Sequence, residues 1–207
     1  MKKRTAFLGA ILFFLRLNQP LIFKTSLSLY SSAVVMLTFP EKVNAKTAQS
    51  FFNSGYEKME DGDYYGAIDD FNKLIKKYPY YSEIHVVYHN RGVSKESIND
   101  FTGALKDYEK AVLINIDYSP SFVGIGNMKQ EFKDYVGALI AYDEAIRINP
   151  EETDAYVGRC NTKFNLKYFY GAIEDCNKAI ILDKNNVYAY RNRGISKEQI
   201  GDLEGAC

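Results

Sequence analysis

Apolar residues recur along most of the chain at the spacing of one face of an α-helix, and they do so in a repeating block. The segment "GAIDDFNKLIKKYP" begins at Gly66, and similar segments begin at Gly103, Gly137 and Gly171. A fifth copy starts at Gly205, just before the sequence ends. Each block also holds a second amphipathic stretch ahead of this segment, so each block predicts two helices.

The predicted helices follow one another as pairs, and no strand pattern interrupts them. A lone helix at about 187–199 comes after the last pair. The predicted pairs lie at about 46–60 with 64–78, 84–97 with 101–114, 119–131 with 135–148, and 153–165 with 169–182. The sequence therefore predicts an all-α chain.

All copies share one register of small and aromatic residues around the Ala at 67, 104, 138, 172 and 206. Twelve residues before this Ala a small residue recurs, at Gly55, Gly92, Gly126, Cys160 and Gly194. Aromatic residues stand four positions earlier, at Phe51, Tyr88, Phe122, Tyr156 and Tyr190. Four after the Ala stand Phe71, Tyr108, Tyr142 and Cys176. Glycine inside a helix costs about 1 kcal/mol relative to Ala, so its recurrence predicts that a neighbouring helix crosses there.

Acidic residues precede the second helix of most pairs and are suited to cap its free N–H groups. They are Asp63, Asp100, Asp134 and Asp202. The fourth copy has Lys167 and Tyr168 at the turn instead, so we expect that helix to be capped less well.

This pattern of small, aromatic and proline positions resembles the tetratricopeptide repeat. The resemblance covers nearly all of 46–207, with repeats at about 48–81, 85–118, 119–152 and 153–186 and a truncated fifth at 187–207. It implies a right-handed superhelical solenoid of antiparallel helix pairs, because one pair cannot bury its own apolar faces. The sequence departs from the family pattern at Cys160, Cys176, Ile116 and Lys184. Three extra residues before Gly92 predict a longer loop or first helix in the second repeat.

The resemblance also implies that the first helices of successive repeats line a concave groove that binds a peptide or another protein. By repeat register, the groove residues are Phe52, Tyr56, Met59, His89, Val93, Glu96, Val123, Asn127, Gln130, Val157, Asn161, Phe164, Tyr188 and Arg191. Gln49, Val86, Asp154 and Ile195 share that register.

Some family members hold a partner's terminal carboxylate with paired Lys and Asn residues. Asn127 and Asn161 are present here without the accompanying Lys residues, so we expect no such clamp. An extended segment with apolar side chains, its backbone hydrogen-bonded by Asn127 and Asn161, fits this lining better. The alternative is that these residues face only solvent or neighbouring helices.

Residues 1–45 differ from the rest of the chain and read as a targeting segment. "MKKR" precedes two apolar runs at 6–15 and 27–39, and "VNA" at 43–45 offers a signal-peptidase site after Ala45. The segment is longer than most signal peptides, so an uncleaved membrane anchor is the rival interpretation. Either predicts an exported protein (periplasm, envelope or lumen) or a membrane-anchored one, with membrane contact through 1–45.

Charge argues against a nucleic-acid partner. The chain has 26 basic and 26 acidic residues, but six of the basic residues and only one acid lie in 1–45. The remaining 20 basic and 25 acidic residues give 46–207 a net charge of −5. A mildly acidic body is not the footprint of a nucleic-acid binder.

Catalytic or metal chemistry finds little support in the sequence. His85 and His89 stand one helical turn apart, but they are the chain's two histidines. A zinc site needs three or four ligands. Val86 excludes the metalloprotease signature that begins with His-Glu. We therefore expect neither an enzyme, nor a metal site, nor a cofactor.

Cysteine usage leaves one pairing open. Cys160 and Cys176 occupy core positions of the same repeat and could form a disulfide in an exported protein. The sequence favours the simpler interpretation that both act as small core residues. Cys207 is left over, and the sequence does not decide whether it is the natural end of the chain; we favour truncation. Nor does it decide the oligomeric state.

Taken together, these patterns predict a non-catalytic scaffold for protein–protein contact. The resemblance suggests a role in assembling a membrane or envelope complex, with a partner that the sequence does not identify. Two alternatives stay open. One is an accessory module that presents a substrate to a separate enzyme, and the other is a truncated remnant without stable function.

Overall fold

A computed structural model describes residues 45–202 of the chain, and every regular element within this range is a helix. The first helix runs over 45–60. It is followed by α3 (Tyr64–Lys77), α4 (Ile84–Ser97), α5 (Phe101–Ile114), α6 (Ser119–Glu131), α7 (Tyr135–Ile148), α8 (Thr153–Asn165), α9 (Phe169–Leu182) and α10 (Val187–Gln199). These helices begin and end within one residue of the predicted ranges.

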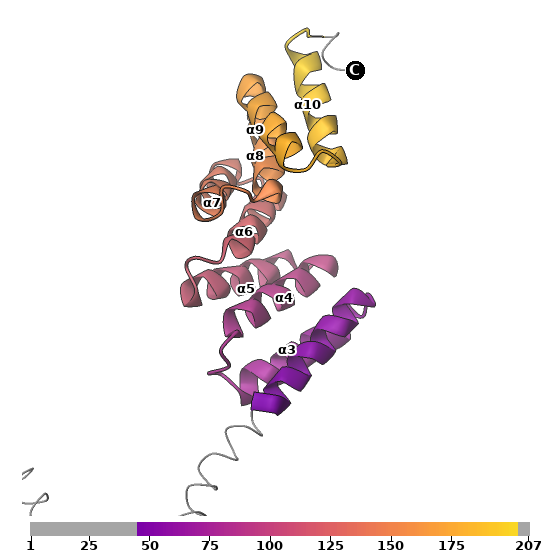
Figure 1. Ribbon diagram of the computed structural model, residues 1–207, viewed down its shortest axis with the longest axis vertical. Coiled ribbons are helices and arrows are strands. Elements are labelled where there is room, and N and C mark those ends of the chain that lie inside the picture. The colour runs from indigo at the N-terminus through magenta and orange to yellow at the C-terminus, as the bar shows by residue number, and fades with distance from the viewer. Residues whose placement is uncertain (1–44, 203–207) are drawn as a thin grey trace, which may run out of the picture. The chain divides into compact units, whose positions relative to one another are not determined.

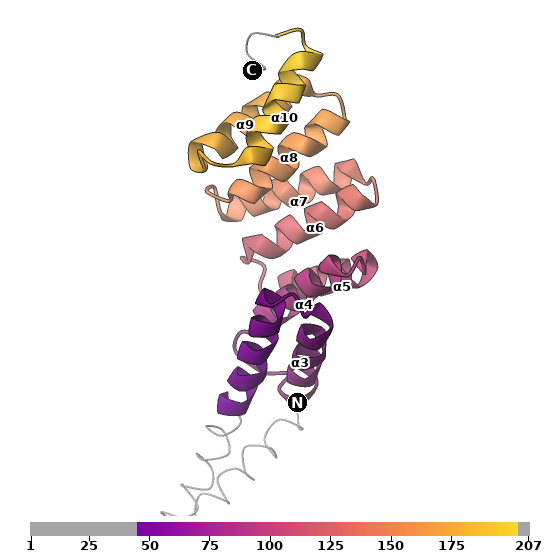
Figure 2. The same ribbon diagram turned by 90° about the vertical axis from the view of Figure 1, so that its right-hand side faces the viewer.

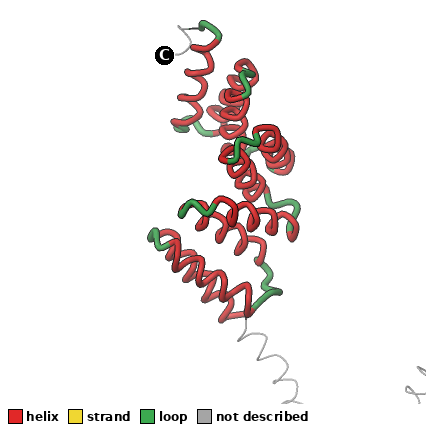
Figure 3. Tube along the Cα trace, turned by 180° about the vertical axis from the view of Figure 1, so that it is seen from behind, coloured by secondary structure: helices red, strands yellow, loops and turns green. Residues whose placement is uncertain are grey.

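The helices pack as successive hairpins, and each hairpin packs on the next along the array (Figures 1 and 2). Short loops join them, as Figure 3 shows. The predicted all-α solenoid of antiparallel helix pairs is therefore confirmed. None of the helices in 45–202 is both long and apolar enough to cross a membrane. The predicted targeting segment, its cleavage site and Cys207 lie outside the described residues.

Aspartate caps start three of the second helices as expected. The side chains of Asp63, Asp100 and Asp134 each accept a hydrogen bond at 2.9 Å from the backbone N–H of Gly66, Gly103 and Gly137, respectively. Tyr168 makes no side-chain cap at α9, so the poorer cap of the fourth pair is also observed. No helix follows Asp202 within the described residues.

The residue before each of these starts adopts a left-handed backbone. Gly62 and Gly201 have φ of 79° and 82°, while Asn99, Lys133 and Lys167 reach 64°, 59° and 64°. Lysine seldom adopts this conformation, so the turn geometry is imposed by the hairpin and not by the residue type.

The repeated small residues lie where helices approach most closely. Ala67, Ala104, Ala138 and Ala172 are fully buried. A methyl group added at Gly55 would lie 2.6 Å from the ring of Phe71, and one at Gly126 would lie 2.5 Å from the ring of Tyr142. The predicted close crossing is therefore present, and the aromatic ring on the second helix fills the space that glycine leaves.

The three extra residues of the second repeat are shared between a loop and a helix. The α3–α4 connection covers 78–83, whereas the later connections between repeats cover 115–118, 149–152 and 183–186. The loop thus takes two of the extra residues, and α4 begins one residue earlier in the repeat register than α6, α8 or α10.

Cys160 and Cys176 form a disulfide, with their sulfurs 2.07 Å apart and their Cα atoms 5.6 Å apart. The interpretation as two separate core residues, favoured from the sequence, was wrong. In the other repeats a Gly faces an aromatic ring at these positions, so the crossing helices are already close. Two cysteines at such a crossing have their Cα atoms within the range that a disulfide spans.

Candidate functional site: a groove between the first helices

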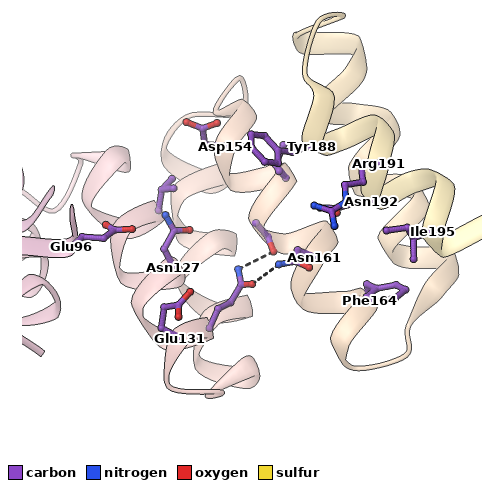
Figure 4. A pocket seen from close by; sticks show the side chains of 14 residues that line it. Glu96, Asn127, Glu131, Asp154, Asn161, Phe164, Tyr188, Arg191, Asn192 and Ile195 are labelled. Atoms are coloured by element: carbon purple, nitrogen blue, oxygen red, sulfur yellow. Dashed lines mark hydrogen bonds between the residues drawn. The ribbon is translucent and has the colours of Figure 1, made fainter. Parts of the chain in front are cut away.

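A groove with a cavity of about 640 Å³ opens between the first helices of successive repeats, α4, α6, α8 and α10. Figure 4 shows side chains from these helices pointing into it. The structure brings nine of the fourteen predicted groove residues around this cavity, namely Glu96, Val123, Asn127, Gln130, Val157, Asn161, Phe164, Tyr188 and Arg191. Asp154 and Ile195 join them, so the register argument led to one continuous surface.

The remaining predicted residues lie elsewhere. His89 and Val93 line a smaller hollow of about 180 Å³, which shares Glu96, Val123 and Asn127 with the main groove. Phe52 packs against Phe71 and Tyr81, Tyr56 stacks on Phe52, and Met59 packs on the first core cluster. These three belong to the first repeat, which is joined to the others through the longer α3–α4 connection.

The two groove asparagines are held by a hydrogen-bond network. The Tyr142 hydroxyl donates to Oδ1 of Asn127 at 2.7 Å. Nδ2 of Asn161 donates to Oε1 of Gln130 at 2.9 Å. Nε2 of Gln130 donates to the Tyr142 hydroxyl and, at 3.2 Å, to the carbonyl oxygen of Gly158. Figure 4 shows the bonds of Gln130 to Asn161 and Gly158 as dashed lines.

This network fixes which polar atoms remain for a partner. Oδ1 of Asn127 is bonded, and its amide NH₂ makes no hydrogen bond to another residue in 45–202. Asn161 uses its side-chain NH₂, and its side-chain Oδ1 has no partner among those residues. One amide therefore offers a donor and the other an acceptor, which is what the backbone of an extended segment needs.

The groove is acidic over α4, α6 and the start of α8. Glu96, Glu131 and Asp154 line it there, and Arg191 on α10 is its only basic residue. Burial, together with the charge of Glu131, raises the pKa of Glu96, although the Tyr108 hydroxyl donates to it. Partial burial, followed by the charges of Glu152 and Asp183, raises the pKa of Asp154.

No protein-family profile matches the sequence, and no curated protein is significantly similar to it. Solved structures, by contrast, match its fold. A MamA protein superposes with a TM-score of 0.66 at 22% identity, over 78% of this chain and 86% of that one. A tetratricopeptide repeat protein from Parabacteroides merdae gives 0.67 at 18% identity, over 78% and 63%.

The chain has the tetratricopeptide repeat (TPR) fold. A third match is the first TPR of Spaghetti (RPAP3) bound to the HSP90 peptide SRMEEVD. It superposes with a TM-score of 0.56 at 18% identity, over 58% of this chain and 95% of that one.

Tyr142, on the second helix of its repeat, packs between two glycines beneath the groove. A methyl group added at Gly126, or at Gly158 of the next repeat, would lie 2.5 Å or 2.4 Å from the ring of Tyr142. The pair Gly92 and Gly124 encloses the ring of Tyr108 in the same way, at 2.8 and 2.7 Å. Each ring thus lies buried between two successive first helices, and its hydroxyl bonds to residues that line the groove, Tyr142 to Asn127 and Gln130 and Tyr108 to Glu96.

Three lining residues were not anticipated from the sequence: Glu131, Gly158 and Asn192. Gly158 and Asn192 share one position of the TPR register. The residue type at this position varies with the size of the core residue on the second helix of the preceding repeat, and this relation is visible in the sequence. Gly158 follows a repeat that carries Tyr142, whereas Asn192 follows a repeat that carries the smaller Cys176. Glu131 stands one helical turn after Asn127, so the face of α6 extended one residue further than we expected.

The two histidines pack around a tyrosine. The rings of His85 and His89 meet Tyr118 edge-on at 5.1 and 5.3 Å, and Nδ1 of His89 lies 3.0 Å from the Ser121 hydroxyl oxygen. Burial, and to a smaller extent the charge of His85, lowers the pKa of His89 to about 4. Across residues 45–202 no group of three or more His, Cys, Asp or Glu is arranged to hold a metal.

Proposed function

We propose that this chain is a non-catalytic scaffold that binds an extended segment of another protein in the groove between α4, α6, α8 and α10. One observation carries the proposal: Asn127 and Asn161, held by the Tyr142 network, present an unpaired donor and an unpaired acceptor in a cavity of about 640 Å³. Fixed polar groups in a preformed cavity lower the cost of ordering a ligand.

Apolar side chains beside the amides support the same occupant. Val157, Phe164 and Ile195 line the cavity, and side chains of an extended segment can bury against them while its backbone bonds to the asparagines. Backbone hydrogen bonds then provide affinity, and the apolar contacts provide selectivity.

The peptide in the RPAP3 structure, SRMEEVD, is acidic. The groove described here holds three carboxylates, no Lys and one Arg. A peptide of that charge would meet repulsion from Glu96, Glu131 and Asp154, so the proposed partner has a different composition.

Site-specific photo-crosslinking in the native host tests the proposal. A photoreactive residue replaces Tyr188, which lines the groove and is 67% exposed, and in a matched control it replaces Ile181, which is 70% exposed but lies outside the groove. We expect one protein to be crosslinked from position 188 and not from 181. Crosslinking of that protein only from 181 would place the interface on another surface and reject the groove.

We further propose that residues 1–45 deliver the chain to an exported or membrane-attached location, where it helps to assemble a membrane or envelope complex. The buried disulfide of Cys160 and Cys176 supports an oxidising compartment. Intact mass and N-terminal sequencing of membrane and soluble fractions test this proposal. A soluble chain starting at Lys46 indicates a cleaved signal, and a membrane chain retaining Met1 indicates an anchor. A chain retaining Met1 in the soluble fraction would contradict both.

A further inference from the structure

We propose that the groove selects a partner segment that carries a Lys or Arg side chain, which inserts between Glu96 of α4, Glu131 of α6 and Asp154 of α8. This inference rests on the proposed function, since it names the chemistry of the segment that the groove binds. The three carboxylates come from three successive repeats, and all of them line the same cavity. Figure 4 shows the three acidic side chains around Asn127.

The aspartates that this chain buries outside the groove are paired with cations. Asp107 is bonded by Arg91 and Lys95 at 2.5 and 2.8 Å. Asp175 is bonded in the same way, at 2.6 and 2.7 Å, by Arg159 and Lys163. These aspartates lie between helices of one repeat, and each has its counter-charge within the chain.

The groove carboxylates lack such partners. Among residues 45–202, no Lys or Arg forms an ion pair with Glu96, Glu131 or Asp154, and the one bond of Glu96 to a side chain comes from the neutral Tyr108 hydroxyl at 2.6 Å. The charge of Glu131 acts on Glu96, and a cation placed beside unpaired acids relieves such repulsion. A Lys or Arg of a partner can therefore provide the positive counter-charge for these carboxylates.

Two of the acids also stand at an unfavourable end of their helices. Glu96 and Glu131 lie in the last turns of α4 and α6, where the helix dipole is negative and disfavours a carboxylate. The lysines of those turns, Lys95 and Lys129, are occupied by Asp107 and Asp134. Helix stability therefore does not explain the two glutamates, and Tyr108 is a partner of Glu96 alone.

The Lys or Arg of the partner segment is expected near the groove acids and away from Arg191. Arg191 lies on α10, at the opposite side of the cavity from Glu96 on α4. A second basic residue of the segment would meet Arg191 there, so selection for positive charge is expected at one part of the segment and not along all of it.

Peptide selection on the purified full chain tests this inference. The probe is a library of random nine-residue peptides, blocked at both ends, presented to the wild-type chain, to E96Q/E131Q and to the control E109Q/E174Q. Glu109 and Glu174 are exposed and lie outside the groove. Glutamine retains the acceptor for Tyr108 and removes only the charge. We expect Lys or Arg to be enriched at one position by the wild type and the control, and this preference to be lost with E96Q/E131Q.

The affinity of a selected peptide, measured by fluorescence anisotropy, gives the size of the effect. The double variant should weaken binding about tenfold, and raising the salt concentration should weaken binding to the wild type more than to the variant. Enrichment of peptides without a charge preference would overturn the inference and leave the proposed function standing. Failure to enrich any peptide would overturn both. Self-association of the wild-type chain that E96Q/E131Q abolishes would identify a second copy as the occupant and overturn a separate partner.

Discussion

The hydroxyl of Tyr142 donates to the side-chain oxygen of Asn127 at 2.7 Å, although the tyrosine belongs to the second helix of its repeat and the asparagine to the groove. The buried ring comes within reach of the groove residues because Gly126 and Gly158 have no side chains to block it. Tyr142 therefore links the packing of two repeats to the orientation of the groove amides of Asn127 and Gln130.

Replacing Tyr142 by Phe should weaken both stability and binding. The ring stays in place, but Asn127 loses its donor and Gln130 loses its acceptor, which should lower the free energy of unfolding by about 1–2 kcal/mol. Peptide affinity should also fall, because the amides are no longer held. Urea unfolding and peptide anisotropy measure the two effects. Y170F, at an exposed tyrosine, is the control and should change neither.

Replacing Gly158 by Ala should destabilise the array, because the added methyl group would meet Cζ of Tyr142 at 2.4 Å. We expect a loss of about 1–3 kcal/mol, typical of overpacking. In a double-mutant cycle with Y142A, which removes the ring, the cost of G158A should largely disappear. G171A is the matched control, because its methyl group meets only the flexible side chain of Lys163 at 3.3 Å. Additive effects of G158A and Y142A would contradict the close approach.

Acidification should destabilise the fold partly through the α7 cap. A hydrogen bond from Lys129 and one from the backbone of Gly137 lower the pKa of Asp134 below 3.8. A carboxyl with a lowered folded-state pKa stabilises the protein above its unfolded-state pKa, and the contribution is lost as the pH falls through the folded value. The melting temperature should therefore drop below about pH 4. D134N keeps a capping side chain and should show a shallower drop; an unchanged slope would exclude this contribution.

Removing the disulfide should destabilise the fourth repeat. Cys160 and Cys176 are 16 residues apart, and closing a loop of that size stabilises a fold by about 3 kcal/mol. C160A/C176A should lower the free energy of unfolding by about that amount, and a reducing agent should affect the wild type but not the variant. The unreduced wild-type chain should titrate one thiol of its three cysteines; three thiols would refute the bond.

The helices could be predicted from sequence almost to the residue, because their signals are local and repeated. Apolar spacing marked each helix, and Asp63, Asp100 and Asp134 marked three starts. The groove lining followed from the same register for Asn127 and Asn161. Periodicity shows which face a residue occupies, and that was sufficient to bring most of the candidate site together.

Contacts between helices were harder to foresee, because they depend on distances that periodicity does not contain. The Tyr142 hydroxyl lies seven bonds from its own backbone nitrogen, and only the paired glycines reveal that it reaches the residues that line the groove. The disulfide depended on how closely two helices cross at Cys160. The ion pair of Arg91 with Asp107 likewise joins residues 16 positions apart on two helices, where neither residue alone signals the other.

The packing of Tyr142 between glycines of two repeats also restricts which repeats can be neighbours in the array. The repeat over 119–152 both receives a neighbour's ring, at Gly124, and offers one, through Tyr142. It could therefore be duplicated in tandem, each copy matching the next. The repeat over 153–186 carries Cys176 in place of the tyrosine, and Asn192 follows it where Gly124 and Gly158 follow the two preceding repeats. Lengthening of the array by gene duplication is thus easiest at its centre. In a tandem copy of the repeat over 153–186, Gly158 of the second copy would face Cys176 of the first, and no aromatic ring would fill the space between the two repeats.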